Sequence, residues 1–307
     1  MPFRIFCYNT IMDEICADRI RAALPGTEEN VPLSELTSFR IGGAARFLLR
    51  PKTYDEIKAA VVFAKQNGIR LALLGRGTNV LASDSGFDGI VIRFDTPIHP
   101  PIFVGTRVVA CCGTSLTQLA RETVRSGLSG LERLCGIPGT VGGACAMNAG
   151  AYGGEIKHVL KRIRIFKDGV DEWVDVNDAD LGYRKSAFSF PNAIALEAEF
   201  CLDTDDGTAA STMQTCMEKR REKQPLELAS AGSTFKRPEG HYAGALIEQC
   251  GLKGYTIGGA QVSDKHAGFL VNTGGATETD VSALIAYVQK AVYDKFGVHL
   301  EPEVKRI

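Results

Sequence analysis

The spacing of apolar residues predicts helices that alternate with strands in the first half of the chain. Within residues 54–67 apolar positions recur at helical spacing, and Gly68 follows as a stop signal. These positions are Ile57, Ala60, Val61 and Ala64. The mostly apolar run at 69–77 ends on glycines, which is typical of a buried strand. A second helix is predicted from Ser115, a favoured N-cap residue, to a C-terminal cap at Gly127.

From His158 the period of the pattern changes to two, which indicates strands. The stretch VLKRIRIFKDGVDEWVDV predicts a hairpin around Asp168-Gly169, because Asp-Gly between two alternating runs is a favoured two-residue turn. Residues 193–202 predict another strand, and the acidic and small residues of DTDDGTAAST then break the pattern. We therefore place a domain boundary near residue 204.

The last hundred residues predict three helices and a closing strand. The helices are expected around 213–223, around 242–250, and from near 279 to Gly297. The third has an apolar stripe made by Val281, Leu284, Ile285, Val288 and Val292. Residues 298–307 alternate again, with Glu301, Glu303 and Lys305 on one face, and Pro302 makes this an edge strand.

Composition and charge exclude several classes of protein. The chain has 307 residues, of which 45% are hydrophobic, so it can bury a large core. Its 35 basic and 36 acidic residues leave no net field for a nucleic acid or an anionic membrane. The nine cysteines lack CxxC spacing, so neither a metal site nor a disulfide framework is predicted, and a cytoplasmic protein is expected. No apolar stretch has the length of a membrane span.

Two clusters of glycine carry the first hint of chemistry. One lies in LLGRGTNVLASDSGFDGIVIR, at 73–93, and the other places eight glycines within 130–156. Glycine is expected where the backbone takes positive φ or approaches something closely. Val80 replaces the third glycine of a Rossmann fingerprint, and no P-loop lysine is present. Two untidy loops remain one interpretation. The other is a concave nest of N–H groups for the pyrophosphate of a dinucleotide, with Pro138 stiffening the second loop and Asn148 bonding a polar edge.

Seven motifs occur in an order that resembles the UDP-N-acetylenolpyruvoylglucosamine reductase family, in its shorter form without an inserted tyrosine loop. They are SFRIGGAARFLLRP, LLGRGTNVLASDSGFDGIVI, GIPGTVGGACAMNAGAYGGEI, YRKSAF, AGSTFKRP, KHAGFLVN and LEPEVKRI. The resemblance spans residues 38–307 and implies an α+β protein. A two-lobed FAD-binding region of the vanillyl-alcohol-oxidase/PCMH type would occupy 31–203, with lobes of about 31–98 and 99–203. A substrate-binding α+β domain would occupy 204–307. Residues 1–30 would be an N-terminal helix preceded by an extension over residues 1–11.

The resemblance also implies a reaction and its partners. FAD, held non-covalently, would pass a hydride from NADPH to the methylene carbon of UDP-N-acetylglucosamine enolpyruvate, giving UDP-N-acetylmuramate for peptidoglycan precursor synthesis. NADH stays an alternative reductant, because no motif for the nicotinamide nucleotide is present. A monomer is expected, without nucleic acid or membrane partners.

Motif positions imply the site residues. Arg184 would be the cation that stabilises the enolate, Ser233 the proton donor, and Glu303 the third catalytic residue. Cofactor contacts are expected from Gly75, Arg76, Gly77, Thr78, Asn79, Gly136, Pro138, Gly139, Gly142, Gly143, Asn148 and Ala149. Substrate contacts are expected from Tyr183, Lys236, Gln249, His266 and Asn272. The chain departs from the family at Arg237, which stands where asparagine is usual.

Two other functions compete with this one. A sugar oxidase of the same flavin superfamily often tethers FAD covalently, and Cys135 and Cys145 lie in the second glycine cluster. A flavin- or UDP-sugar-binding protein without activity would need no proton donor. Retention of all three catalytic positions argues against the second alternative.

Overall fold

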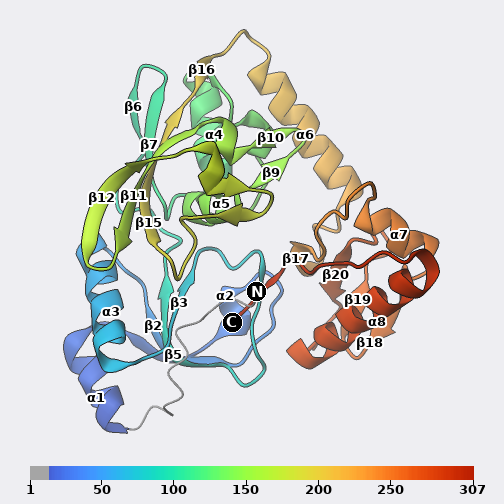
Figure 1. Ribbon diagram of the computed structural model, residues 1–307, viewed down its shortest axis with the longest axis horizontal. Coiled ribbons are helices and arrows are strands. Elements are labelled where there is room, and N and C mark those ends of the chain that lie inside the picture. Colours follow the sequence, from blue (N-terminus) through green and yellow to red (C-terminus); the bar gives the residue numbers. More distant parts are fainter. Residues whose placement is uncertain (1–13) are drawn as a thin grey trace.

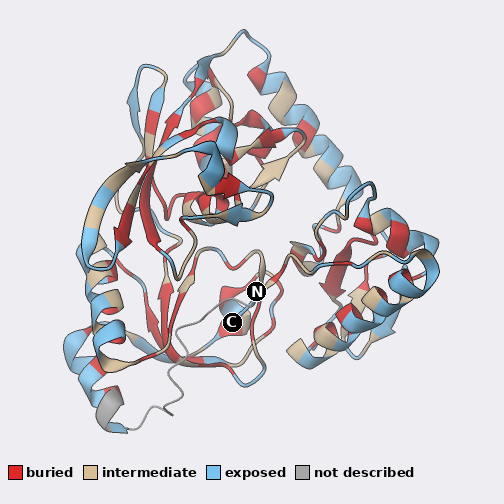
Figure 2. Cartoon of the chain, in the orientation of Figure 1, coloured by how far each residue is buried: buried red, intermediate tan, exposed pale blue. Residues whose placement is uncertain are grey.

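Three sheets of four or five strands, drawn from successive parts of the chain, form the framework of the described residues (Figure 1). The computed structural model describes residues 14–307, and the N-terminal extension predicted from the sequence lies outside this range. Figure 2 shows that the inner strands of the first two sheets are mostly buried, whereas most of their edge strands and the outer faces of the helices are exposed. The domain boundaries predicted at 30, 98 and 203 stay a prediction, although the sheets take their strands from 28–93, 102–201 and 229–272.

The first lobe is a four-stranded sheet in the order β1-β2-β5-β3. Its strands are β1 (Glu28–Pro32), β2 (Ala44–Leu49), β3 (Leu71–Leu74) and β5 (Phe87–Arg93). The helices are α1 (Glu14–Ala23), α2 (Leu33–Leu36) and α3 (Tyr54–Asn67). The predicted helix α3 is confirmed: Gly68 ends it at φ 63°, and Ile57, Ala60 and Ala64 pack into the core. Strand β3 is also confirmed.

The second lobe is an antiparallel sheet in the order β12-β11-β15-β7-β6. Its strands are β6 (Ile102–Val104), β7 (Arg107–Cys111), β11 (Leu160–Lys167), β12 (Val170–Asp175) and β15 (Ile194–Cys201). The predicted hairpin is confirmed, with Asp168 and Gly169 at φ 50° and 87°. Positive φ at both turn positions matches the twist of the two strands.

Helices and short strands complete the second lobe. The helices are α4 (Leu116–Arg125) and α5 (Val141–Met147), with 3-10 turns at Glu132–Leu134, Ile156–His158 and Asp178–Asp180. Short strand pairs are β8 (Leu128–Ser129) with β16 (Asp203–Thr204), β9 (Gly150–Ala151) with β10 (Gly154–Glu155), and β13 (Leu181–Gly182) with β14 (Lys185–Ser186). Ser115 caps α4 as predicted, but Ser126 rather than Gly127 is its C-cap. Gly127 follows in the left-handed conformation, at φ 72°.

The C-terminal domain follows α6 (Ala209–Lys223), a long helix that runs from the second lobe toward it in Figure 1. Its sheet has the order β17-β20-β19-β18, with β17 (Ala229–Ser233), β18 (Thr256–Ile257), β19 (Ala260–Val262) and β20 (Phe269–Asn272). The helices α7 (Ala243–Gln249) and α8 (Glu278–Phe296) match the predictions. All five residues of the α8 stripe are buried. Among residues 14–307 no helix is long and apolar enough to cross a membrane.

The closing segment differs from the predicted edge strand. Only β21 (Lys305–Arg306) is a strand, and it pairs in parallel with β4 (Val80–Leu81) of the first lobe. Upstream, Pro302 forms a single bridge to Phe235 of the C-terminal domain. Alternation described the burial of this segment but could not indicate that its backbone divides its hydrogen bonds between two domains.

Asp84 of the first lobe caps a helix of the C-terminal domain. One carboxylate oxygen accepts the N–H of Glu278 at 2.7 Å, and the other accepts the N–H and hydroxyl of Thr279 at 3.1 and 3.0 Å. Partial burial raises the pKa of this carboxyl, but the three hydrogen bonds outweigh that effect and hold the pKa below its usual value. The negative charge also lies at the positive end of the α8 dipole.

We expect Asp84→Ala to reduce the free energy of unfolding by about 1 kcal/mol at pH 7, the usual effect of losing a helix cap. Because the folded-state pKa of Asp84 lies below its unfolded value of about 3.9, this contribution is present above that value and is lost as pH falls through the folded pKa. Melting temperatures at pH 7, 5 and 3 measure it. The matched control is Asp88→Ala, which removes an ion pair to Arg46 within the first lobe. A deficit for Asp84→Ala that persists unchanged at pH 3 would contradict the charge-dependent cap.

Candidate active site

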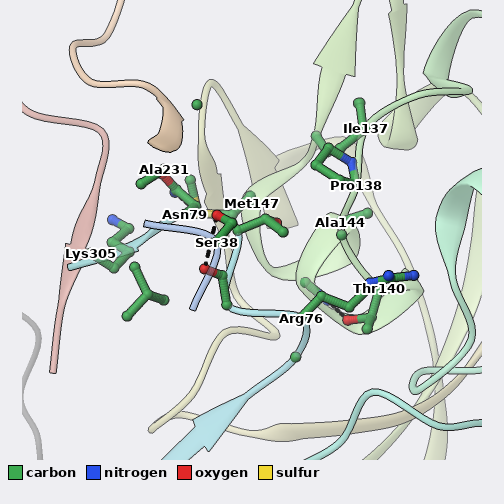
Figure 3. Close-up of a pocket in the computed structure, with 18 of the residues that line it drawn as sticks. Ser38, Arg76, Asn79, Ile137, Pro138, Thr140, Ala144, Met147, Ala231 and Lys305 are labelled. Atoms are coloured by element: carbon green, nitrogen blue, oxygen red, sulfur yellow. Dashed lines mark hydrogen bonds between the residues drawn. The ribbon is translucent and has the colours of Figure 1, made fainter. Parts of the chain in front are cut away.

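One large cavity lies where the three parts of the protein meet. Its volume is about 1090 Å³, and its lining comes from 71–80 of the first lobe, 136–152 and 184–195 of the second, 217–233 around the end of α6, and 303–307. Figure 3 shows Ile137, Pro138, Thr140 and Ala144 on one side of it and Lys305 and Ala231 on the other. Fifteen of the predicted site residues line it: Gly75, Arg76, Gly77, Thr78, Asn79, Gly136, Pro138, Gly139, Gly142, Gly143, Ala149, Arg184, Ser233, His266 and Glu303.

The first glycine cluster has the properties of an anion nest. Among residues 14–307, the backbone N–H groups of 75–79 make no hydrogen bond, although all five residues line the cavity. Gly77 has φ 65°, and a Cβ there would lie 2.3 Å from the carbonyl oxygen of Leu36. A run of unpaired N–H groups beside a cavity suits a pyrophosphate, because each group needs an acceptor.

The second cluster is used differently from the prediction. The N–H groups of Val141, Gly142 and Gly143 bond Thr114 O, Cys112 O and the Thr140 hydroxyl at 2.8, 2.8 and 3.1 Å. Only the N–H groups of 139 and 140 are unpaired within 139–143, as far as the described chain shows. The start of α5 is thus held by the protein itself, and the nest is built mainly by the first cluster.

Most glycines of the second cluster serve close packing rather than positive φ. Of the eight, only Gly130, Gly136 and Gly153 have positive φ. A Cβ at Gly142 would lie 2.9 Å from the Cβ of Cys112, so α5 packs directly on the end of β7. Gly139 is the exception: its nearest neighbour to such a Cβ is the Thr78 hydroxyl at 3.7 Å, and the space beyond belongs to the cavity.

Asn148 was predicted to contact the cofactor, and this stays a prediction, but the structure gives its side chain another use. It is 1% exposed, ends α5 at φ 40°, and does not line the cavity. Its amide donates to Gly182 O and Glu155 at 3.1 and 3.2 Å, and its oxygen accepts the N–H of Lys157 at 2.9 Å. Asparagine suits this position because it tolerates the left-handed conformation and its amide bonds three partners.

Arg184 and Glu303 form an ion pair at the cavity wall. Arg184 Nε lies 2.8 Å from Glu303 Oε1, and the two side chains are only 19% and 15% exposed. Arg184 sits in the turn between β13 and β14 at φ 55°, an unfavourable conformation for arginine. Burial raises the pKa of Glu303, and the nearby Arg184 charge opposes that rise.

Ser233 ends β17 and is exposed in the cavity. The neighbouring residue Thr234 joins it to the closing segment, because the N–H of Glu303 bonds Thr234 O at 2.7 Å. A hydroxyl and a carboxylate are therefore carried on adjoining segments of the chain, with the guanidinium of Arg184 reaching in from the second lobe. This arrangement brings a fixed cation, a hydroxyl and a carboxylate to the wall of one cavity.

The expected substrate residues separate into two groups. His266 lines the cavity; its Nδ1 accepts the N–H of Gly268 at 3.1 Å, and burial lowers its pKa, which favours the neutral ring. The others do not line it. Asn272 joins domains instead, since its amide donates to Phe39 O at 3.1 Å and its oxygen accepts the N–H of Gly274 and Ala276. Gln249 lies exposed at the end of α7, where its carbonyl accepts from Lys295 at 2.5 Å.

Tyr183, Lys236 and Arg237 cluster beside the cavity rather than within its lining. Lys236 pairs with Glu301, and the Tyr183 hydroxyl accepts the N–H of Arg237 at 3.1 Å. The guanidinium of Arg237 stacks 4.0 Å above the ring of Tyr242. In place of the usual asparagine, Arg237 thus holds a cation on an aromatic face next to the other two side chains.

Arg220 of α6 lines the cavity and was not predicted. Its guanidinium donates to Gly136 O at 2.7 Å, while Nε is buried without a hydrogen-bond partner in the described chain, and burial lowers its pKa. An unpaired donor of a buried cation at a cavity wall fits an anionic ligand. Its position on a helix with little amphipathic pattern gave no signal, because only its contact with the distant Gly136 loop brings it to the site.

The thiols do not fit a covalent flavin link. Neither Cys135 nor Cys145 lines the cavity, and both are fully buried. Burial raises the pKa of Cys145 to about 12, so its nucleophilic thiolate form is scarce. Cys112 does line the cavity, and burial raises its pKa well above the usual value.

Comparisons with known proteins agree with this geometry. A family model for the UDP-N-acetylenolpyruvoylglucosamine reductase C-terminal domain matches residues 224–307, and a model for an FAD binding domain matches 45–171. UDP-N-acetylenolpyruvoylglucosamine reductase of Clostridium botulinum strain Hall is 45% identical over 282 residues, 90% of each chain. That of strain Alaska E43 is 45% identical over 285 residues, 91% of this chain and 92% of the relative. The crystal structure of the Thermus caldophilus reductase has a TM-score of 0.77 and 33% identity, covering 91% of this chain and 99% of that one.

The nest, the buried cations and the matched FAD binding domain define an FAD-dependent oxidoreductase. The chain belongs to the UDP-N-acetylenolpyruvoylglucosamine reductase family. The predicted fold class is confirmed: a two-lobed FAD-binding region precedes a C-terminal α+β domain. The cavity, with its free N–H groups, suits FAD, whose diphosphate residues 75–79 would hold.

We expect valine at Gly139 and at Gly142 to have different effects. At Gly139 the side chain would enter the cavity, so FAD retention should fall while the melting temperature of the apoprotein changes little. At Gly142 it would collide with Cys112, and overpacking of this kind costs about 1–3 kcal/mol. Bound flavin per chain and apoprotein melting temperature, measured together, separate the two. Identical behaviour of both variants would show that the assignment of cavity and packing roles is wrong.

Proposed function

We propose that the protein reduces the enolpyruvyl group of UDP-N-acetylglucosamine enolpyruvate to the lactyl ether of UDP-N-acetylmuramate, with NADPH as reductant. Membership of the reductase family supports the reaction. The observation that carries the proposal is the convergence of Arg184, Glu303 and Ser233 on the cavity that also holds the nest. FAD, when bound non-covalently, supplies the hydride carrier between NADPH and substrate.

Arg184 has the role of stabilising negative charge on the substrate. Hydride addition to the methylene carbon leaves charge on the neighbouring carbon and its carboxylate, as an enolate. A fixed cation lowers the energy of this charge, by about 3–4 kcal/mol for one well-placed donor in a water-poor site. The pair with Glu303 and the constrained turn hold the guanidinium in place before substrate binds, so little reorganisation is needed.

Ser233 has the role of delivering the proton to carbon. A hydroxyl is a weak acid, but a carbanion-like acceptor makes it adequate when the two atoms are held close together. Burial raises the pKa of Glu303, whose backbone N–H bonds the residue that follows Ser233 and whose side chain pairs with Arg184. We propose that Glu303 orients the side chains of both Ser233 and Arg184.

The UDP portion has the cluster of Tyr183, Lys236 and Arg237 as its binding surface. Lys236 suits a diphosphate as a point charge, and Arg237 adds a second cation already fixed on Tyr242. We assign His266, at the cavity wall, a hydrogen-bond role; Gln249 and Asn272 lie outside the cavity lining, and their predicted contacts with substrate stay predictions. We assign the cofactor contacts to the eleven predicted residues that line the cavity, and we add Arg220 to them.

A visible spectrum of the purified protein tests this function. Anaerobic NADPH should bleach the flavin absorbance, and UDP-N-acetylglucosamine enolpyruvate should then restore it. A free sugar is the control reductant: bleaching by the sugar but not by NADPH, followed by rapid recovery with oxygen, would identify a sugar oxidase instead. Flavin retained after denaturation would contradict non-covalent binding.

We expect Ser233→Ala to slow only the second half of this cycle. The substitution removes the proton donor and nearly preserves volume, so flavin reduction by NADPH should stay close to normal. Reoxidation by substrate should fall by about 10²–10⁴-fold, the usual contribution of one general acid. Stopped-flow absorbance times each phase separately, and Ser230→Ala, on the same strand, is the matched control. Slow flavin reduction with intact reoxidation would place Ser233 at the nicotinamide instead.

A further inference from the structure

A second pocket adjoins the active-site cavity and is lined by arginines. Its volume is about 500 Å³, and Arg76 and Pro138 belong to the lining of both. In Figure 3 Arg76 extends beside Thr140, on the side of the cavity where Pro138 lies. The remaining lining comes from the start and outer face of α4, including Arg121 and Arg125.

The three arginines of this pocket have no counterions. Among residues 14–307, the exposed side chains of Arg76, Arg121 and Arg125 make no hydrogen bond or ion pair. Arg121 and Arg125 are four residues apart on α4, a spacing at which like charges repel each other. The one carboxylate in the lining, Glu122, accepts a hydrogen bond from Gln118 at 2.8 Å. The pocket therefore keeps an excess of positive charge that the fold itself does not use.

The geometry of this pocket also favours an anionic ligand. The pocket lies at the start of the ten-residue helix α4, where the helix dipole is positive. The hydroxyls of Ser115 and Thr117 also line it, but they bond the N–H of Gln118 and the Gly136–Ile137 backbone, so the arginines supply the free donors. Arginine from two separate segments can surround a phosphoryl group with several charge-assisted hydrogen bonds. Arg76 also belongs to the nest, so its backbone and side chain serve two adjacent sites.

We propose that this pocket binds a phosphoryl group beside the flavin cavity. Two sources have this chemistry: the 2′-phosphate of the dinucleotide reductant, which rests on the proposed use of NADPH, and free inorganic phosphate. In the first case the pocket distinguishes NADPH from NADH, for which the chain has no sequence motif. In the second it is a separate ligand site of the holoenzyme.

Titration calorimetry of the FAD-loaded protein at constant ionic strength tests the pocket. The probes are adenosine 2′,5′-bisphosphate, adenosine 5′-monophosphate and inorganic phosphate. We expect the bisphosphate and inorganic phosphate to bind, and the double variant Arg121→Gln/Arg125→Gln to raise their Kd about tenfold or more. The matched control Arg50→Gln removes an arginine that pairs with Glu28 outside both pockets and should leave these Kd values unchanged. Lysine at 121 and 125 should restore part of the affinity.

Stopped-flow flavin reduction then separates the two sources. A KM for NADPH that rises in the double variant relative to the KM for NADH identifies the 2′-phosphate; an unchanged ratio with lost phosphate binding identifies the free anion. The proposal is overturned if neither phosphate probe binds the native protein, or if the double variant binds them equally well. If NADPH fails to reduce the native enzyme, the proposed function is wrong. The binding of inorganic phosphate then tests by itself whether the pocket holds a phosphoryl group.

Discussion

The backbone hydrogen bonds of the closing segment hold the active site together. The N–H of Glu303 bonds Thr234 O in the C-terminal domain, and two residues later the N–H of Lys305 bonds Asn79 O in the first lobe, at 2.7 and 3.0 Å. The side chain of Glu303 meanwhile pairs with Arg184 of the second lobe. One short stretch therefore contacts all three parts of the protein, and the relative positions of hydroxyl, guanidinium and nest depend on it. Asp84 and Asn272 reinforce the same junction from other directions.

Local patterns predicted the elements of the fold well, because each element depends on neighbours in sequence. The apolar stripe of α8, the Asp168-Gly169 turn and the Ser115 cap need only short-range physics, and the structure contains all three. The closing strand was wrong for the opposite reason. Its partners lie more than sixty positions away, in Thr234 and Asn79, and alternation of side chains carries no information about which backbone will pair with it.

The site shows the same division. A glycine cluster correctly indicated exposed N–H groups at 75–79, but sequence did not distinguish those from the N–H groups of 141–143, which Cys112, Thr114 and Thr140 occupy. The resemblance placed Arg184, Ser233 and Glu303, whose meeting no spacing could predict. It also assigned Asn148 to the cofactor, where the structure has a buried amide with three protein partners. The sequence analysis did not indicate Arg220 or the arginines of α4. These residues stand out only because side-chain nitrogens of theirs lack hydrogen-bond partners in the described chain.

The backbone of Arg184 has a consequence for the evolution of this enzyme. At φ 55° a glycine or asparagine would fold more comfortably than arginine, so the residue that carries the charge is one that the turn itself disfavours. Selection for heat resistance alone would favour replacing it, and would remove the cation proposed to stabilise the enolate together with the strain. Variants at this position that are selected for solubility or melting temperature should therefore also be screened for turnover, because thermal stability and activity favour different residues there.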